Sequence, residues 1–79
     1  MLLTIFKLAS EQGDSGAQYN LGVMYYYGEG VKQDFTKAFY YCRLSAEQGN
    51  EDALLSLANM YEKVIVFSRI MIKLYIIIS

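Results

Sequence analysis

The stretch "LASEQGDSGAQYNLGVMY" (Leu8–Tyr25) decides the fold, because the chain repeats it 36 residues further on. Aligned without gaps on "LSAEQGNEDALLSLANMY" (Leu44–Tyr61), it is identical at eight of 18 positions. Typical residue usage would give about one identity by chance. A period of this length falls in the range of helical repeat arrays. The sequence therefore predicts an all-α chain of stacked helical units.

Each copy of the repeat carries one apolar stripe at helical spacing. In the first copy the stripe consists of Ala17, Leu21, Met24 and Tyr25. In the second copy it consists of Ala53, Leu57, Met60 and Tyr61. A helix between the two copies would have Ala38, Tyr41, Cys42 and Ser45 on its inner face. Small residues at Gly22, Ala38 and Ala58 are expected to allow close helix packing. We therefore expect helices near residues 1–12, 15–27, 34–48 and 51–62.

The segment "YYYGEGVKQD" (25–34) reads as a helix end, a tight turn and the start of the next helix. Gly28 can take the left-handed conformation that ends a helix, and Gly30 continues the turn. The side chain of Val31 would pack against the base of this turn, and Asp34 would cap the following helix. Gly49 is expected to end that helix. A phosphate-binding loop is the weaker interpretation, because no strand precedes the glycines and no third glycine follows them.

These residues closely resemble the Sel-one-like repeat, a relative of the tetratricopeptide repeat. The matching positions, all between Gly13 and Gly49, are Ala17, Leu21, Gly22, Tyr25, Gly28, Gly30, Val31, Asp34, Ala38, Tyr41, Ser45, Ala46 and Gly49. The resemblance implies stacked antiparallel helix pairs in a right-handed α/α superhelix, here a solenoid fragment of about one and a half repeats. It also implies a scaffold or adaptor that binds other proteins and has no chemistry of its own.

Composition excludes several other classes. The chain has no histidine and one cysteine, Cys42, so it lacks the commonest general base and any cysteine-based metal site. A small buried thiol is therefore the better interpretation of Cys42 than a nucleophile. The carboxylates of Glu47, Glu51 and Asp52 lie at a helix junction, where solvated charges are expected. We predict no catalytic residue, no metal site and no cofactor; hydrolase-like activity in cysteine-rich relatives is the less favoured alternative.

The tyrosines of the first helix indicate either a surface that binds partners or packing against the helices of the next unit. Tyr25, Tyr26 and Tyr27 cannot share one face, since successive helical residues differ by about 100° in direction. By analogy with tetratricopeptide arrays, the first helix of each unit would line a concave contact surface. The predicted contact residues are Tyr19, Val23, Tyr26, Tyr27, Leu55, Asn59 and Glu62. Nucleic acid is not an expected partner, because no basic groove accompanies the rings and the formal net charge is −1.

The segment "KVIVFSRIMIKLYIIIS" (63–79) departs from the repeat. Residues 1–62 carry all eight acidic residues, whereas residues 63–79 carry three basic residues and six of the seven isoleucines. Val64, Val66 and Phe67 stand where the repeat would have its turn. No glycine or proline follows Glu51, so we expect the helix that begins there to continue toward residue 78. We accordingly divide the chain into a repeat region, 1–62, and an apolar basic tail, 63–79.

Three interpretations of this tail stay open: a helix that closes the array, an anchor on a membrane surface, and a segment read out of frame. We favour the last, because composition and repeat register change at the same point. The segment is short for a membrane span, and Arg69 and Lys73 interrupt it. The N-terminal stretch is not typical of a signal peptide, and the sequence assigns no compartment. We also expect marginal stability or self-association, because arrays need about three repeats to bury a continuous core.

Overall fold

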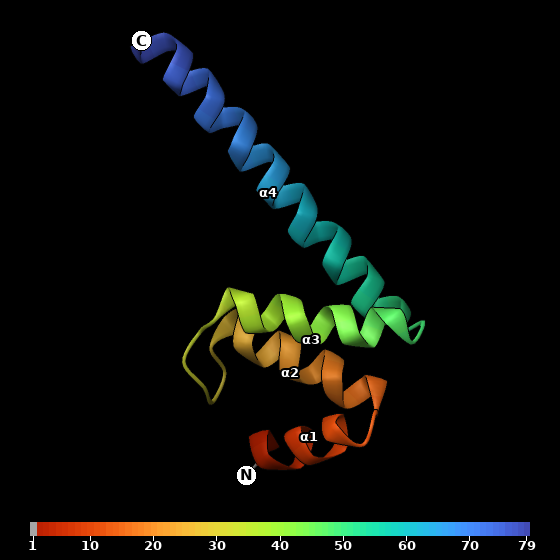
Figure 1. Ribbon diagram of the computed structural model, residues 1–79. Helices are drawn as coiled ribbons and strands as arrows, with labels where there is room; N and C mark the ends of the chain where they lie inside the picture. Colours follow the sequence, from red (N-terminus) through yellow and green to blue (C-terminus); the bar gives the residue numbers. More distant parts are fainter. Residues whose placement is uncertain (1) are drawn as a thin grey trace.

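The computed structural model describes residues 2–79 as four helices, and no strand occurs in this part of the chain. They are α1 (Leu2–Glu11), α2 (Ser15–Tyr27), α3 (Phe35–Glu47) and α4 (Glu51–Ile78). Successive helices run in opposite directions, and α1, α2 and α3 lie in adjacent layers (Figure 1). The helix α4 packs on α3 near its start and then extends away from the other helices. The prediction of an all-α solenoid fragment is confirmed.

Three helices begin at a side-chain cap. Asp14, Asp34 and Asn50 each accept a hydrogen bond from the backbone N–H three residues further on, at 3.0–3.1 Å. Each cap satisfies one of the four N–H groups that a helix leaves without an internal partner at its start. The cap residues therefore fix where α2, α3 and α4 begin.

The turn between α2 and α3 depends on two glycines. Gly28 and Gly30 have φ values of +71° and +72°, in the left-handed region that other residues rarely adopt. The backbone N–H of Asp34 donates to the carbonyl oxygen of Tyr25 at 2.9 Å, which ties the start of α3 to the end of α2. Val31 is half-buried against the core below this turn. The turn thus folds α3 back along α2.

The core lies mainly between α2 and α3. Leu21, Tyr25 and Ala38 are buried there, and α1 contributes Leu3 and Phe6 from the other side of α2. Polar groups in this interface are paired. The hydroxyl of Ser45 donates to the carbonyl oxygen of Ser15 at 2.7 Å, and the side-chain amide of Gln48 donates to that of Gln18, also at 2.7 Å. Buried polar groups lose stability unless they are hydrogen-bonded, so these bonds are part of the packing.

The helix α4 continues from Glu51 to Ile78 without a break, so the expectation of one extended helix is confirmed. All residues from Tyr61 onward are exposed. Even so, among residues 2–79 no helix is both long and apolar enough to cross a membrane. The division of the chain at residue 62 stays a prediction, since α4 passes through this point. Met1, which the sequence places in the first helix, lies outside the described residues.

Two expectations for α4 were wrong. Tyr61 was predicted to share the buried stripe, but it is exposed, and its ring makes an edge contact with that of Phe39. Ala58 was predicted to allow close helix packing, but it is also exposed. The reason is the same for both residues. Their equivalents in α2 are covered by α3, and no helix among residues 2–79 covers the corresponding side of α4.

Candidate functional site

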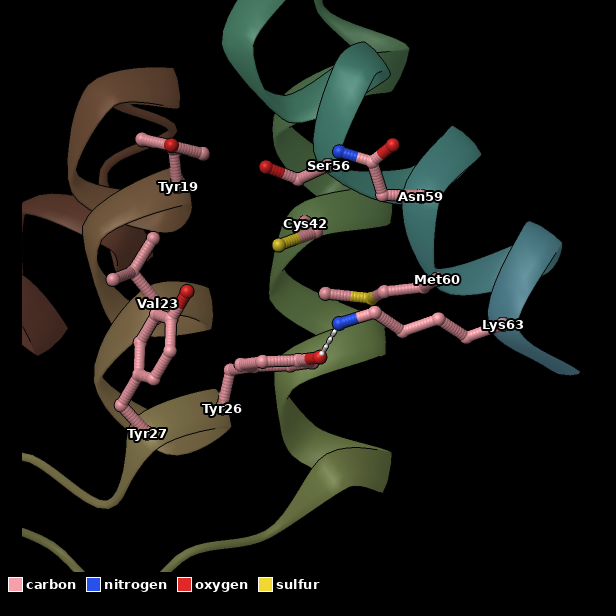
Figure 2. A pocket seen from close by; sticks show the side chains of 9 residues that line it. All are labelled: Tyr19, Val23, Tyr26, Tyr27, Cys42, Ser56, Asn59, Met60 and Lys63. Carbon is pink, nitrogen blue, oxygen red and sulfur yellow. Dashed lines mark hydrogen bonds between the residues drawn. The ribbon is translucent and has the colours of Figure 1, made fainter.

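A pocket of about 180 Å³ lies between α2 and α4 (Figure 2). Figure 2 shows α2 forming one wall, α4 the opposite wall, and Cys42 of α3 between them. The residues that line it are Tyr19, Val23, Tyr26, Tyr27, Cys42, Ser56, Asn59, Met60 and Lys63. Since α3 packs against both α2 and α4, it holds the two walls at a fixed separation.

Helical spacing sets the α2 wall. Tyr19, Val23 and Tyr26 recur at intervals of four and three residues, so they lie along one side of the helix. The ring of Tyr26 makes edge contacts with Tyr27, at 4.9 Å between centroids, and with Phe35, at 5.4 Å. Such edge-to-face pairs are the arrangement that aromatic rings prefer. They hold the Tyr26 ring in place at the mouth of the pocket.

Lys63 links the two walls. Its ammonium nitrogen donates to the hydroxyl of Tyr26 at 2.6 Å, across 37 residues of sequence. The same nitrogen is 5.2 Å from the centroid of the Tyr26 ring, so the ammonium contacts the hydroxyl rather than the ring face. This hydrogen bond raises the pKa of Lys63 above its usual value. Lys63 is therefore a cation at neutral pH, and it is the only charged side chain that lines the pocket.

Cys42 forms the floor. Its side chain is buried, and burial raises the pKa of the thiol. Because burial disfavours the thiolate, Cys42 is a neutral, weakly polar surface at the base of the pocket at physiological pH.

The structure brings five of the seven predicted contact residues to this pocket: Tyr19, Val23, Tyr26, Tyr27 and Asn59. It does not bring the other two. Leu55 is exposed and does not line the pocket. Glu62 lies beside it, in a shallower hollow of about 490 Å³ along α4, which it shares with Asn59 and Lys63.

Sequence reasoning missed four lining residues. They are Cys42, Ser56, Met60 and Lys63. The repeat offset carried a signal for one of them, since Lys63 lies 36 residues after Tyr27, which was predicted. For Ser56 and Met60 the sequence signal is weaker. Both lie on the side of α4 that faces α2, and only the packing of the helices shows which side this is.

Comparison with known proteins assigns the repeat. The profile of the Sel1 repeat family matches residues 15–50, which cover α2, the turn and α3. No solved structure gives a significant match to the chain.

Three curated relatives come from a virus, an animal and a bacterium. A putative sel1-like repeat-containing protein of Acanthamoeba polyphaga mimivirus is 50% identical over 49 residues, which cover 62% of this chain and 8% of that protein. Protein sel-1 homolog 2 of Homo sapiens is 38% identical over 63 residues, covering 78% of this chain and 9% of that protein. The exopolysaccharide production negative regulator of Rhizobium leguminosarum bv. viciae is 38% identical over 79 residues, covering 87% of this chain and 30% of that protein.

The chain spans less than a tenth of the first two relatives and under a third of the last. The matched segment coincides with the helix pair that the repeat predicted and includes the glycine turn and the cap at Asp34. Residues 15–50 form a Sel1 repeat, and over this part the chain is similar to other proteins that contain this repeat.

Proposed function

We propose that this protein is an interaction scaffold that binds a segment of another protein in the pocket between α2 and α4. Sel1 repeats are typically protein–protein interaction modules. The observation that carries the proposal is the meeting of five predicted contact residues, from two helices, at a single pocket. Tyrosine is also among the residues that contribute most to binding at protein interfaces.

The size and charge of the pocket indicate what it would hold. A volume of about 180 Å³ is smaller than the roughly 300–1,000 Å³ of typical small-molecule sites, and closer to that of one or two side chains. Tyrosine rings surround it, and the Lys63 ammonium is its only charge. The partner we propose is therefore a peptide segment with an apolar or aromatic side chain next to a carboxylate.

We also propose that the protein performs no chemistry of its own. Members of this family are generally non-catalytic scaffolds. Two features of the chain support the proposal: it contains no histidine, and its single thiol is buried with a raised pKa. A nucleophilic cysteine needs a lowered pKa and a base beside it.

The test begins with a photo-crosslinking amino acid placed at Tyr19 in the full chain, which identifies the partner and its contacting segment. Binding of the purified partner is then measured for a variant with Tyr19→Ala and Tyr26→Ala. We expect its Kd to rise by about tenfold or more, since 1.4 kcal/mol corresponds to tenfold and each interface anchor contributes about 2 kcal/mol.

A matched control is Tyr40→Ala. Tyr40 lies on α3, is exposed, and does not line the pocket, so this variant should bind as tightly as the wild type. If the Tyr19 and Tyr26 pair binds with the wild-type Kd, or if Tyr40→Ala weakens binding as much, the pocket is not the contact site.

The distal half of α4 favours a second candidate function, attachment to a membrane surface. Residues 64–78 are exposed along the whole helix and carry Arg69 and Lys73 but no acidic residue. Basic, apolar helices of this kind bind anionic lipid surfaces. Flotation with vesicles of anionic and of neutral lipid tests this. Binding to anionic vesicles that is lost in an Ile70→Glu, Ile72→Glu variant would support the role, and no flotation of the wild type would exclude it.

A further inference from the structure

The internal repeat gives each helix an equivalent, and the equivalents differ in how they are covered. An offset of 36 residues relates α1 to α3 and α2 to α4. The helix α2 has α1 on one side and α3 on the other, whereas no helix among residues 2–79 covers the side of α4 that faces away from α3 (Figure 1). Within residues 2–79, one side of α4 and one side of α1 are therefore uncovered, although the corresponding sides of α2 and α3 are covered.

Burial shows which side of α4 is free. Gln18 and Tyr25 of α2 face α3 and are 5% and 6% exposed. Their equivalents in α4, Leu54 and Tyr61, are 51% and 54% exposed. The equivalent of Gly22, which is buried where α2 meets α3, is the exposed Ala58. The free side of α4 is the side that a second helix of the next unit would cover.

The free side of α1 is its complement. Ala38 and Tyr41 of α3 pack against α2, and the rings of Tyr41 and Tyr25 stack. Their equivalents in α1 are Leu2 and Ile5, which are 65% and 59% exposed. By this offset α1 corresponds to the second helix of a repeat and α4 to the first helix.

We propose that two copies of this chain join head to tail, with α1 of one copy packed antiparallel on α4 of the other. The junction repeats the arrangement of α3 on α2, so that Ile5 covers Tyr61 as Tyr41 covers Tyr25. After pairing, the copy that contributes α1 keeps its α4 free, and the copy that contributes α4 keeps its α1 free. The contact is therefore heterologous, and it extends the superhelix by adding further copies rather than closing as a symmetric dimer.

The hollows on the two free sides support this arrangement. The hollow beside α1, of about 630 Å³, is lined in part by Phe6, Asn20, Val23 and Met24. The equivalents of these four residues, 36 positions further on, all line the pocket of Figure 2. They are Cys42, Ser56, Asn59 and Met60.

The hollow on α4 supplies the opposite wall. It contains Asn59, Glu62 and Lys63, which are the equivalents of Val23, Tyr26 and Tyr27 in the pocket. Joining the two hollows builds a second pocket of the same design across the junction. Glu62, which does not reach the pocket within one chain, would line this second pocket.

The junction between two copies differs in one respect from the packing of α3 on α2 within one chain. The Cys42 sulfur lies so close to Gly22 that an added Cβ would be 2.5 Å from it. At the junction the equivalent pair is Phe6 and Ala58, and both residues are larger. The two helices must therefore lie further apart than α2 and α3 do, which weakens the contact relative to the intrachain one.

The test uses two full-length variants that block opposite ends. Ile5→Glu places a charge on the free side of α1, and Ala58→Glu places one on the free side of α4. Both side chains are exposed within one chain, so circular dichroism should show unchanged helix content. In sedimentation velocity, the wild type should form species larger than a dimer as concentration rises, and each variant alone should stay monomeric. An equimolar mixture should form a 1:1 dimer and nothing larger, because one intact α1 meets one intact α4.

A third variant, Ile72→Glu, charges the distal part of α4 outside the junction and should assemble as the wild type does. Three results would overturn the proposal: a wild type that is monomeric throughout the series, single variants that still associate, or a mixture that forms no dimer. Loss of assembly in Ile72→Glu alone would point to pairing of the distal helices instead. None of these readouts depends on a partner protein, so they are independent of the proposed function.

Discussion

At the scale of single residues, Gly22 of α2 packs closely against Cys42 of α3. A Cβ at Gly22 would lie 2.5 Å from the Cys42 sulfur and 3.1 Å from the carbonyl oxygen of Ala38. Real Cβ atoms do not come this close to neighbouring atoms, so the side chain or the helix would have to move. Gly22 is therefore needed for packing, although glycine costs about 1 kcal/mol relative to alanine inside a helix.

We predict that Gly22→Ala lowers the free energy of unfolding by about 1–3 kcal/mol, because overpacking outweighs the gain in helix propensity. Urea denaturation followed by circular dichroism measures it. The double variant with Cys42→Ala should lose less than the sum of the two single losses, since it removes the nearest atom. A single Gly22→Ala variant as stable as the wild type would show that the helices move apart at no cost.

The Cys42 thiol predicts how stability depends on pH. Burial raises its pKa above the ordinary value of 9.0, so the unfolded chain loses this proton at lower pH than the folded one. Stability from this group is fully present below about pH 9 and is lost as pH rises through the folded pKa. Burial also raises the pKa of Tyr41, which adds a further loss above about pH 10.

We therefore expect the free energy of unfolding to fall as pH rises above about 9, and the part of this fall that begins below about pH 10 to disappear in Cys42→Ala. Urea titrations at a series of pH values check it. An unchanged slope in the alanine variant would assign the effect to other groups.

At the scale of elements, the pair α2–α3 carries its own start and stop signals. The cap at Asp34 and the left-handed Gly28 act within a few residues of sequence, so the local chain fixes both ends of the turn. By contrast, α4 has a cap at Asn50 but no glycine or proline to stop it. It therefore runs for 28 residues, about twice the length of α2 or α3.

We predict that Asp34→Ala lowers the free energy of unfolding by about 1 kcal/mol, the usual cost of losing a side-chain cap. Asp34→Asn is the matched control. It keeps an oxygen that can accept from the Lys37 N–H and should stay within a few tenths of a kcal/mol of wild type. Thermal melts of the three proteins compare them directly. Equal losses in both variants would mean that charge rather than the hydrogen bond provides the stability.

At the scale of the whole molecule, packing is concentrated at the N-terminal side of Lys63. Core residues come from α2 and α3, with support from α1 and the start of α4. The distal part of α4 is exposed along its length, and it is rich in β-branched isoleucine and valine, which lower helix propensity. Its backbone hydrogen bonds therefore depend on the helix alone.

We expect backbone amides of residues 64–78 to exchange with deuterium at least about 100-fold faster than those of the core positions in α2 and α3, because local opening of an unsupported helix costs little free energy. Hydrogen exchange read by mass spectrometry measures this in Ile5→Glu, where the junction is blocked. Equal protection in the two regions would show that another part of the chain or a second copy covers the distal helix.

The sequence by itself determined the features that depend on neighbouring residues. The cap at Asp34, the glycine turn and the register of the Ala17–Tyr25 stripe all follow from local hydrogen bonding and helical spacing. The unbroken α4 was also predictable, since no residue in it favours a stop. The internal repeat then indicated which helices pair.

Only the tertiary structure decided which side of each helix is covered. The repeat predicted that Tyr61 is buried like Tyr25, but burial requires a second helix, and α4 continues straight through the place where the turn to that helix would begin. The packing of α4 relative to α2 likewise decides that Lys63 reaches Tyr26 and that Leu55 does not line the pocket. Helical periodicity fixes directions within one helix, but the distance between two helices is set by the side chains packed between them, here by Gly22 against Cys42.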